Sequence, residues 1–117
     1  MVKVIVLIIF LIATPCYAWD RNDTLREVAW QGLHLVDWGQ TLNIAKEPTL
    51  YHEINPLMGK HPSVGKVNTY MCLSALTHLG VSALLPKEYR IYWQWISIGV
   101  TSGLIIHNYN IGLKVRF

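Results

Sequence analysis

The residues best suited to acid–base chemistry in this chain of 117 residues lie on two segments far apart in sequence. His34, Asp37 and Thr41 recur at the i, i+3, i+7 spacing of one helical face, and His78 lies in a later apolar run. A carboxylate in apolar surroundings shifts its pKa or finds a donor, and His78 is the available donor. The pattern predicts either a structural Asp37–His78 hydrogen bond between helices or a proton or cation site centred on these two residues, and the catalytic candidates are Asp37, His78 and Glu53.

A second group consists of imidazole and carboxylate side chains that could meet at one end of the helices. Three histidines and a glutamate are adequate ligands for zinc or a similar divalent metal, although their spacing matches no metal-binding motif. The alternative is that Glu53 and Asn55 cap a turn and that no cofactor is bound. The candidate ligands are His52, Glu53, His61 and His107, with Asn108 beside the last of them.

Three helices are needed to position these groups. Apolar periodicity and helix-end signals predict helices over residues 24–45, 67–85 and 91–109. The first can be capped by Asn22, Asp23 or Thr24, and Pro86 ends the second. Residues 46–66 contain three prolines and two glycines and are predicted to form a loop. Residues 87–90 are predicted to form a short charged turn.

Composition favours an apolar environment for these helices. Apolar residues make up 52% of the chain and charged residues 15%, against about 25% charged residues in a typical soluble domain. The predicted helices 67–85 and 91–109 contain no Asp, Glu, Lys or Arg. The resulting prediction is an all-α fold, a small helical membrane bundle in contact with the lipid bilayer. The first helix either spans the bilayer or lies on its surface, and the scattered basic residues argue against a nucleic-acid partner.

The first 18 residues have the pattern of a secretory leader. Lys3 precedes the apolar run 4–13, Pro15 interrupts it, and Ala18 ends a stretch that a signal peptidase could cleave. An uncleaved anchor is the alternative. The predicted organisation is a signal segment at 1–18 followed by one helical domain at 19–117. The predicted location is the inner membrane of a bacterium, reached through the secretory route.

The third predicted helix carries a pair of glycines at helical spacing. Gly99 and Gly103 share one face, so another helix can approach closely there. Either a helix of the same chain or a helix of a second copy could use this face.

Two short motifs resemble those of a family of small bacterial multi-span membrane proteins. The motifs are Asp37-x-x-x-Thr41 and the later run Glu53-x-Asn55-Pro56-Leu57-Met58. In that family an Asp-x-x-x-Thr helix precedes a Glu-x-Asn-Pro turn and further membrane helices. The resemblance covers about one-third of the chain. It implies a helical membrane bundle and a role for Asp37, Thr41, Glu53 and Asn55, but no reaction.

These patterns lead to two functional hypotheses. The first is a non-enzymatic interaction or accessory protein that acts through helix contacts with itself or with another membrane protein. The chain shows no nucleotide loop and no nucleophile constellation, which favours this hypothesis over an enzyme. The alternative is a metal-dependent or proton-relaying membrane enzyme or transporter.

Overall fold

The computed structural model describes residues 19–117, and this part of the chain is all-α, as predicted. Its helices are α2 (Arg21–Lys46), α3 (Val64–Leu84) and α4 (Lys87–Asn110), and no strand occurs among the described residues. Each helix begins about one turn earlier than predicted. Residues 87–90, predicted to be a turn between helices, form the first turn of α4.

The helix starts are explained by residues just before each helix. Asp20 caps α2 by accepting from the backbone N–H of Asp23, whose carboxylate accepts in return from the N–H of Asp20. Ser63 caps α3 by accepting from the N–H of Lys66. Pro86 precedes α4, where its missing N–H leaves no hydrogen bond unmade. The predicted caps of the first helix are therefore wrong, because the true cap, Asp20, lies earlier in the chain.

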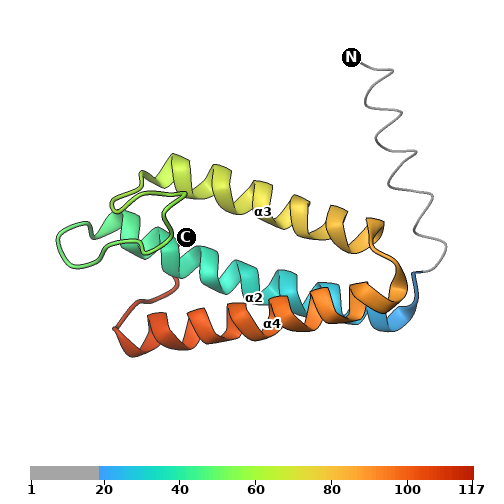
Figure 1. The fold of residues 1–117 in the computed structure, drawn as a ribbon. Coiled ribbons are helices and arrows are strands. Elements are labelled where there is room, and N and C mark those ends of the chain that lie inside the picture. Colours follow the sequence, from blue (N-terminus) through green and yellow to red (C-terminus); the bar gives the residue numbers. More distant parts are fainter. Residues whose placement is uncertain (1–18) are drawn as a thin grey trace, which may run out of the picture.

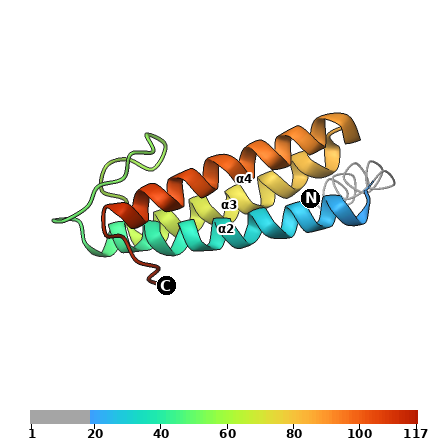
Figure 2. The same cartoon turned by 90° about the horizontal axis from the view of Figure 1, so that it is seen from below.

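Helix α2 is the central element of the bundle. Figure 1 shows α3 and α4 on either side of it, and Figure 2 shows the three helices running side by side along their length. Both α3 and α4 contact α2 more extensively than they contact each other. The α3–α4 connection is a tight turn at Leu85 and Pro86, whereas residues 47–63 form the long loop from α2 to α3. This arrangement leaves space between α3 and α4.

The apolar core lies at the loop end of the bundle. Leu42, Met58, Val67 and Met71 pack together there, beside the partly buried Trp38. The C-terminal tail returns across α2, where the N–H of Arg116 donates to the carbonyl of Gly39 at 3.0 Å. The tail lies so close to α2 that a Cβ at Gly39 would be 2.3 Å from Cγ1 of Val115. Only glycine fits at that position without displacing the tail.

The interior of the rest of the bundle is polar. Asp23, Glu27, His78, Arg90 and Gln94 are all buried. Large apolar side chains point outward instead, and many of them are more than half exposed. They include Leu25, Val28 and Leu35 of α2, Leu73 and Leu76 of α3, and Tyr92, Trp95 and Ile106 of α4.

The structure corrects the prediction of transmembrane helices. Among residues 19–117, none of the helices combines the length and the mean hydropathy that a membrane crossing requires. The physical reason is the number of polar residues along each helix, such as Glu27, His78 and Gln94, which lower its mean hydropathy. Two of the predicted helices contain no formally charged residue, but uncharged polar residues are enough to lower their mean hydropathy. The predicted membrane bundle is therefore replaced by an all-α bundle with a polar interior. The predicted leader at 1–18 lies outside the described residues.

Candidate functional site

The three helices are joined by a group of buried polar side chains at the end where α3 turns into α4, here called the paired cluster. Its centre is Arg90, whose Nη1 donates to Asp23 Oδ2 at 3.0 Å. Arg90 also donates from Nε to the carbonyl of Ser82 and from Nη2 to that of Leu85. These carbonyls belong to the C-terminal end of α3, where backbone acceptors lack helical partners. One guanidinium therefore caps the C-terminal end of α3 and links it to α2. The cluster consists of Asp23, Glu27, His78, Ser82, Arg90 and Gln94.

Glu27 is the second anion of the paired cluster, one turn along α2 from Asp23. Its Oε1 accepts from His78 Nδ1 at 3.0 Å and from Gln31, and its Oε2 accepts from Ser82 at 2.9 Å and from Gln94 at 3.3 Å. Burial raises the pKa of this carboxyl, but the hydrogen bonds from His78, Gln31 and Ser82 outweigh it and lower the pKa to about 2. Glu27 is therefore ionised, and its carboxylate accepts the Nδ1–H of His78.

The imidazole of His78 is enclosed by aromatic rings. It stacks on Trp30 with ring centroids 3.7 Å apart and on Trp93 with centroids 4.9 Å apart. His34 also stacks on Trp30, with ring centroids 4.6 Å apart. While Nδ1 is bonded to Glu27, Nε2 of His78 is buried and has no hydrogen-bond partner among the described residues. Such an atom is unusual, because buried polar atoms nearly always have a partner.

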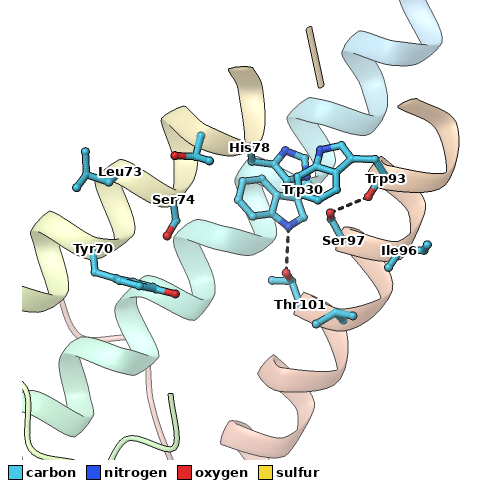
Figure 3. A pocket seen from close by; sticks show the side chains of 11 residues that line it. Trp30, Tyr70, Leu73, Ser74, His78, Trp93, Ile96, Ser97 and Thr101 are labelled. Carbon is cyan, nitrogen blue, oxygen red and sulfur yellow. Dashed lines mark hydrogen bonds between the residues drawn. The ribbon is translucent and has the colours of Figure 1, made fainter. Parts of the chain in front are cut away.

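His78, Trp30 and Trp93 form part of the wall of a pocket of about 560 Å³ between α3 and α4, here called the α3–α4 pocket. Figure 3 shows Trp30 of α2 between the two outer helices, with its Nε1 bonded to Thr101 Oγ1 at 3.0 Å. Tyr70 and Ser74 line the α3 side, and Ser97 lines the α4 side. The pocket exists because both outer helices pack on α2 and separate from each other beyond it.

The predicted pairing of Asp37 with His78 is wrong. His78 bonds to Glu27, and Asp37 instead accepts a long hydrogen bond of 3.4 Å from Asn108 Nδ2. Burial, together with repulsion by the Glu53 carboxylate, raises the pKa of Asp37 from 3.8 to about 6. Asp37 and Glu53 line a second pocket, of about 430 Å³, here called the loop-end pocket. Asp37 and His78 were predicted to share a site, but they lie at different levels of the bundle.

The other predicted polar residues form hydrogen bonds to backbone groups or to neighbouring side chains. His34 Nε2 donates to the carbonyl of Met71 at 2.9 Å, and burial lowers the pKa of His34. Thr41 donates to the carbonyl of Asp37, one turn back on the same helix. Asn55 donates from Nδ2 to Tyr70 Oη and accepts at Oδ1 from the N–H of Leu57. Asn108 also donates to Gln40 Oε1.

The predicted metal ligands are not brought together. Within residues 19–117, no group of three or more His, Cys, Asp or Glu side chains could hold a metal ion. Glu53 accepts at Oε1 from the N–H groups of Ile54 and Asn55, which is the turn-capping arrangement weighed as the alternative. The candidates His52, Glu53, His61 and His107 therefore do not form a ligand set in this structure.

The predicted glycine face of α4 is open. An added Cβ at Gly99 or at Gly103 would meet nothing within 4 Å among the described residues. Of the two uses predicted for this face, close packing against another helix of the same chain is therefore not observed.

Sequence reasoning missed most of the paired cluster. Glu27 was not among the candidate residues, and Arg90 was placed in a predicted turn, although both are central to the interior. A signal was present, because the polar stripe of α2 continues from His34 back through Glu27 to Asp23 in steps of seven and four residues. Arg90 and Gln94 are likewise one turn apart on α4.

We compared the chain with protein-family models, with curated proteins and with solved structures, and none of the three comparisons gave a match.

Proposed function

We propose that this protein is a non-enzymatic interaction protein that acts through helix contacts, and that its principal contact surface is the outer face of α4. The observation that supports this proposal is the distribution of side chains in the bundle. Polar groups are bonded to one another inside, while large apolar side chains are left outside. Exposed apolar area of this kind, spread over whole helix faces, is typical of surfaces that bind a partner.

The outer face of α4 is defined by Tyr92, Trp95, Gly99, Gly103 and Ile106, which lie opposite the buried Arg90, Gln94 and Thr101. Its two aromatic residues and Ile106 are each more than half exposed. The glycines lie between these larger side chains, and the space above them is open. A second helix could therefore approach the backbone of α4 closely at Gly99 and Gly103, with the larger side chains on either side.

A second copy of this chain is the occupant that this face fits. Residues 91–110 contain no Asp, Glu, Lys or Arg, so two copies of the face would not repel each other. Two-fold symmetry places the same patch on both partners, and a face with small residues at its centre and large ones at its ends can be complementary to itself. The protein would then act as a dimer held by α4 against α4.

The test is sedimentation equilibrium of the purified protein, comparing wild type with Gly99→Leu/Gly103→Leu. We expect the wild type to dimerise and the double variant to associate at least about tenfold more weakly, since close approach is blocked. Gly32→Leu is the matched control, because Gly32 is also an exposed helical glycine with open space around it. A monomeric wild type would contradict the proposal, and so would equal weakening by the control. Binding of the monomer to lipid vesicles would then reassign the apolar surface to lipid.

The proton-relaying alternative is supported by one observation, the raised pKa of Asp37 beside Glu53. A pKa of about 6 would allow this carboxyl to exchange its proton near neutral pH. Titration of Asp37 by NMR tests this property directly, and a pKa below 5 would remove the support.

A further inference from the structure

We infer that the two α4 helices of the dimer proposed above run antiparallel, and that Trp95 of each copy fills a groove beside the C-terminal tail of the other copy. The inference rests on the proposed dimer and adds its direction and its anchor residue. Three observations lead to it: the groove, the position of Trp95 along α4, and the charges at the two ends of the outer face.

The groove, here called the tail groove, lies between α2 and the C-terminal end of α4, and the tail supplies one wall. Figure 2 shows the tail leaving the end of α4 and crossing to α2. The groove has a volume of about 450 Å³, whereas a cavity of about 150 Å³ already binds benzene, so an indole ring can enter it. Ile106 belongs both to the groove and to the outer face of α4, so the two surfaces are continuous. The other apolar lining residues are Val36, Ile105, Tyr109, Leu113 and Val115.

Trp95 lies on the same side of α4 as the tail groove, but toward the other end of the helix. Trp95 and Tyr109 are 14 residues apart, which is close to four helical turns, so they lie along one edge of the outer face. The side chain of Trp95 is 58% exposed. An exposed tryptophan and an apolar groove therefore share one edge of the same helix.

Two-fold symmetry brings this tryptophan and this groove together. The two helices can approach most closely midway between Gly99 and Gly103. At 1.5 Å per residue, Trp95 lies about 9 Å before this point, and Ile106 and Tyr109 lie about 8 and 12 Å after it. A two-fold axis through this point and perpendicular to α4 therefore places Trp95 of one copy at the tail groove of the other, on the same edge. A parallel dimer would instead place Trp95 at the level of Trp95.

The charges at the two ends of the face favour the same direction. Glu88 continues the stripe of Tyr92 and Trp95 at the start of α4, and Lys114 lines the tail groove at the opposite end. Both side chains are exposed, and neither forms an ion pair within residues 19–117. An antiparallel dimer brings Glu88 of each copy to the end at which Lys114 of the other copy lies, whereas a parallel dimer brings like charges together.

A pair of variants tests the seat of Trp95, with dimerisation followed by sedimentation equilibrium. Trp95→Ala removes the anchor, and Val36→Phe fills part of the tail groove from α2, away from the outer face of α4. We expect each substitution to weaken dimerisation at least about fivefold. Leu76→Ala is the control, because Leu76 is 62% exposed on α3 and should leave the dimer unchanged. Normal dimerisation of Val36→Phe, or an equal effect of the control, would overturn the assignment of Trp95 to the groove.

The direction is tested by disulfide cross-linking of full chains in which Cys16 and Cys72 are replaced by alanine. Tyr92→Cys and Asn110→Cys place one thiol near either end of the outer face. We expect cross-links between the two variants in a mixture and none within either alone, because a disulfide needs Cα atoms within about 7 Å. Gly32→Cys, at an open position on α2, gives the background of chance collisions.

The cross-linking results separate the inference from the proposed dimer. Cross-links within each variant alone would show a parallel dimer, which overturns the inference and leaves dimerisation through α4 standing. Absence of cross-links above background in every sample would overturn the antiparallel arrangement. Sedimentation equilibrium of the same samples then shows whether the dimer itself fails with it.

Discussion

Each end of the bundle holds a carboxylate of α2, buried in the case of Glu27 and partly buried in the case of Asp37, and the two carboxyl pKa values shift in opposite directions. In the paired cluster, Glu27 accepts four hydrogen bonds, and its pKa falls to about 2. In the loop-end pocket, Asp37 accepts one long hydrogen bond at its carboxylate and faces a second acid, and its pKa rises to about 6. Burial opposes ionisation at both sites, so the number of donors decides the outcome. The comparison assigns a stabilising role to one end and a titrating group to the other.

The difference also has a structural origin. The paired cluster lies where α3 and α4 are joined by a short turn, so side chains of all three helices converge on the start of α2. At the loop end, the long segment 47–63 connects α2 to α3, and the C-terminal tail crosses α2. Its polar side chains mostly serve their own turns, as Glu53 and Asn55 do. Fewer donors are therefore left for Asp37.

The largest effect is expected from Arg90→Met in the paired cluster. The substitution would leave the Asp23 carboxylate buried with Arg26 as its remaining cationic partner, and would free two carbonyls at the end of α3. Breaking a buried ion pair in this way lowers the free energy of unfolding by about 3–5 kcal/mol. Urea denaturation measures the change. Arg116→Met is the control, because Arg116 and Glu47 form an exposed pair whose loss should change stability by less than about 1 kcal/mol. Similar losses of unfolding free energy in both variants would contradict the greater stabilising role given to the buried Arg90–Asp23 pair.

Glu27→Gln tests the second anion of the same cluster. We expect the free energy of unfolding at pH 7 to fall by about 2–3 kcal/mol, because the hydrogen bonds from His78, Ser82 and Gln94 lose their charged acceptor. The folded pKa of Glu27 is lowered from 4.5 to about 2, so its stabilisation is present above pH 4.5 and is lost as the pH falls toward 2. Wild type should therefore lose stability across this range more steeply than the variant. Parallel pH profiles would contradict the lowered pKa.

Asp37→Asn should change the free energy of unfolding in the opposite direction from Glu27→Gln. The folded pKa of Asp37 is raised from 3.8 to about 6, so the unfolded chain releases this proton first, and stability falls as the pH rises between these values. Removing the carboxylate should raise the free energy of unfolding by about 1–2 kcal/mol at pH 7 and by little at pH 4. Denaturation at the two pH values measures the difference. A loss of stability at pH 7, or an equal gain at both values, would contradict the raised pKa.

The smallest effect is expected from Gly39→Ala, which separates the tail from the helix. The new methyl group would overlap Val115, so the tail must move, at a cost of about 1 kcal/mol. Gly32→Ala should instead gain about 0.5–1 kcal/mol, because the site is open and alanine favours the helix. Faster removal of residues 113–117 by carboxypeptidase in Gly39→Ala alone would support the tail contact.

The sequence predicted the all-α class, the three helices and the break at Pro86, because apolar periodicity and helix-end residues are local signals. It did not predict which polar residues meet. His78 was paired with Asp37 because both lie near the middle of their helices, but the packing of α3 on α2 places His78 beside Glu27, ten residues before Asp37. Arg90 was missed because four polar or charged residues after a proline resemble a loop. The transmembrane assignment was wrong because an absence of formal charge does not ensure high mean hydropathy.

The most direct test of the contrast between the two ends is an NMR titration of the side-chain carboxyl carbons of Glu27 and Asp37 in the intact protein. We expect Glu27 to remain ionised down to about pH 2 and Asp37 to titrate near pH 6. Asp37→Asn and Glu27→Gln assign the two resonances. If both carboxyls titrate near 4, or if Glu27 titrates above Asp37, the donors that surround Glu27 do not control the two sites as described.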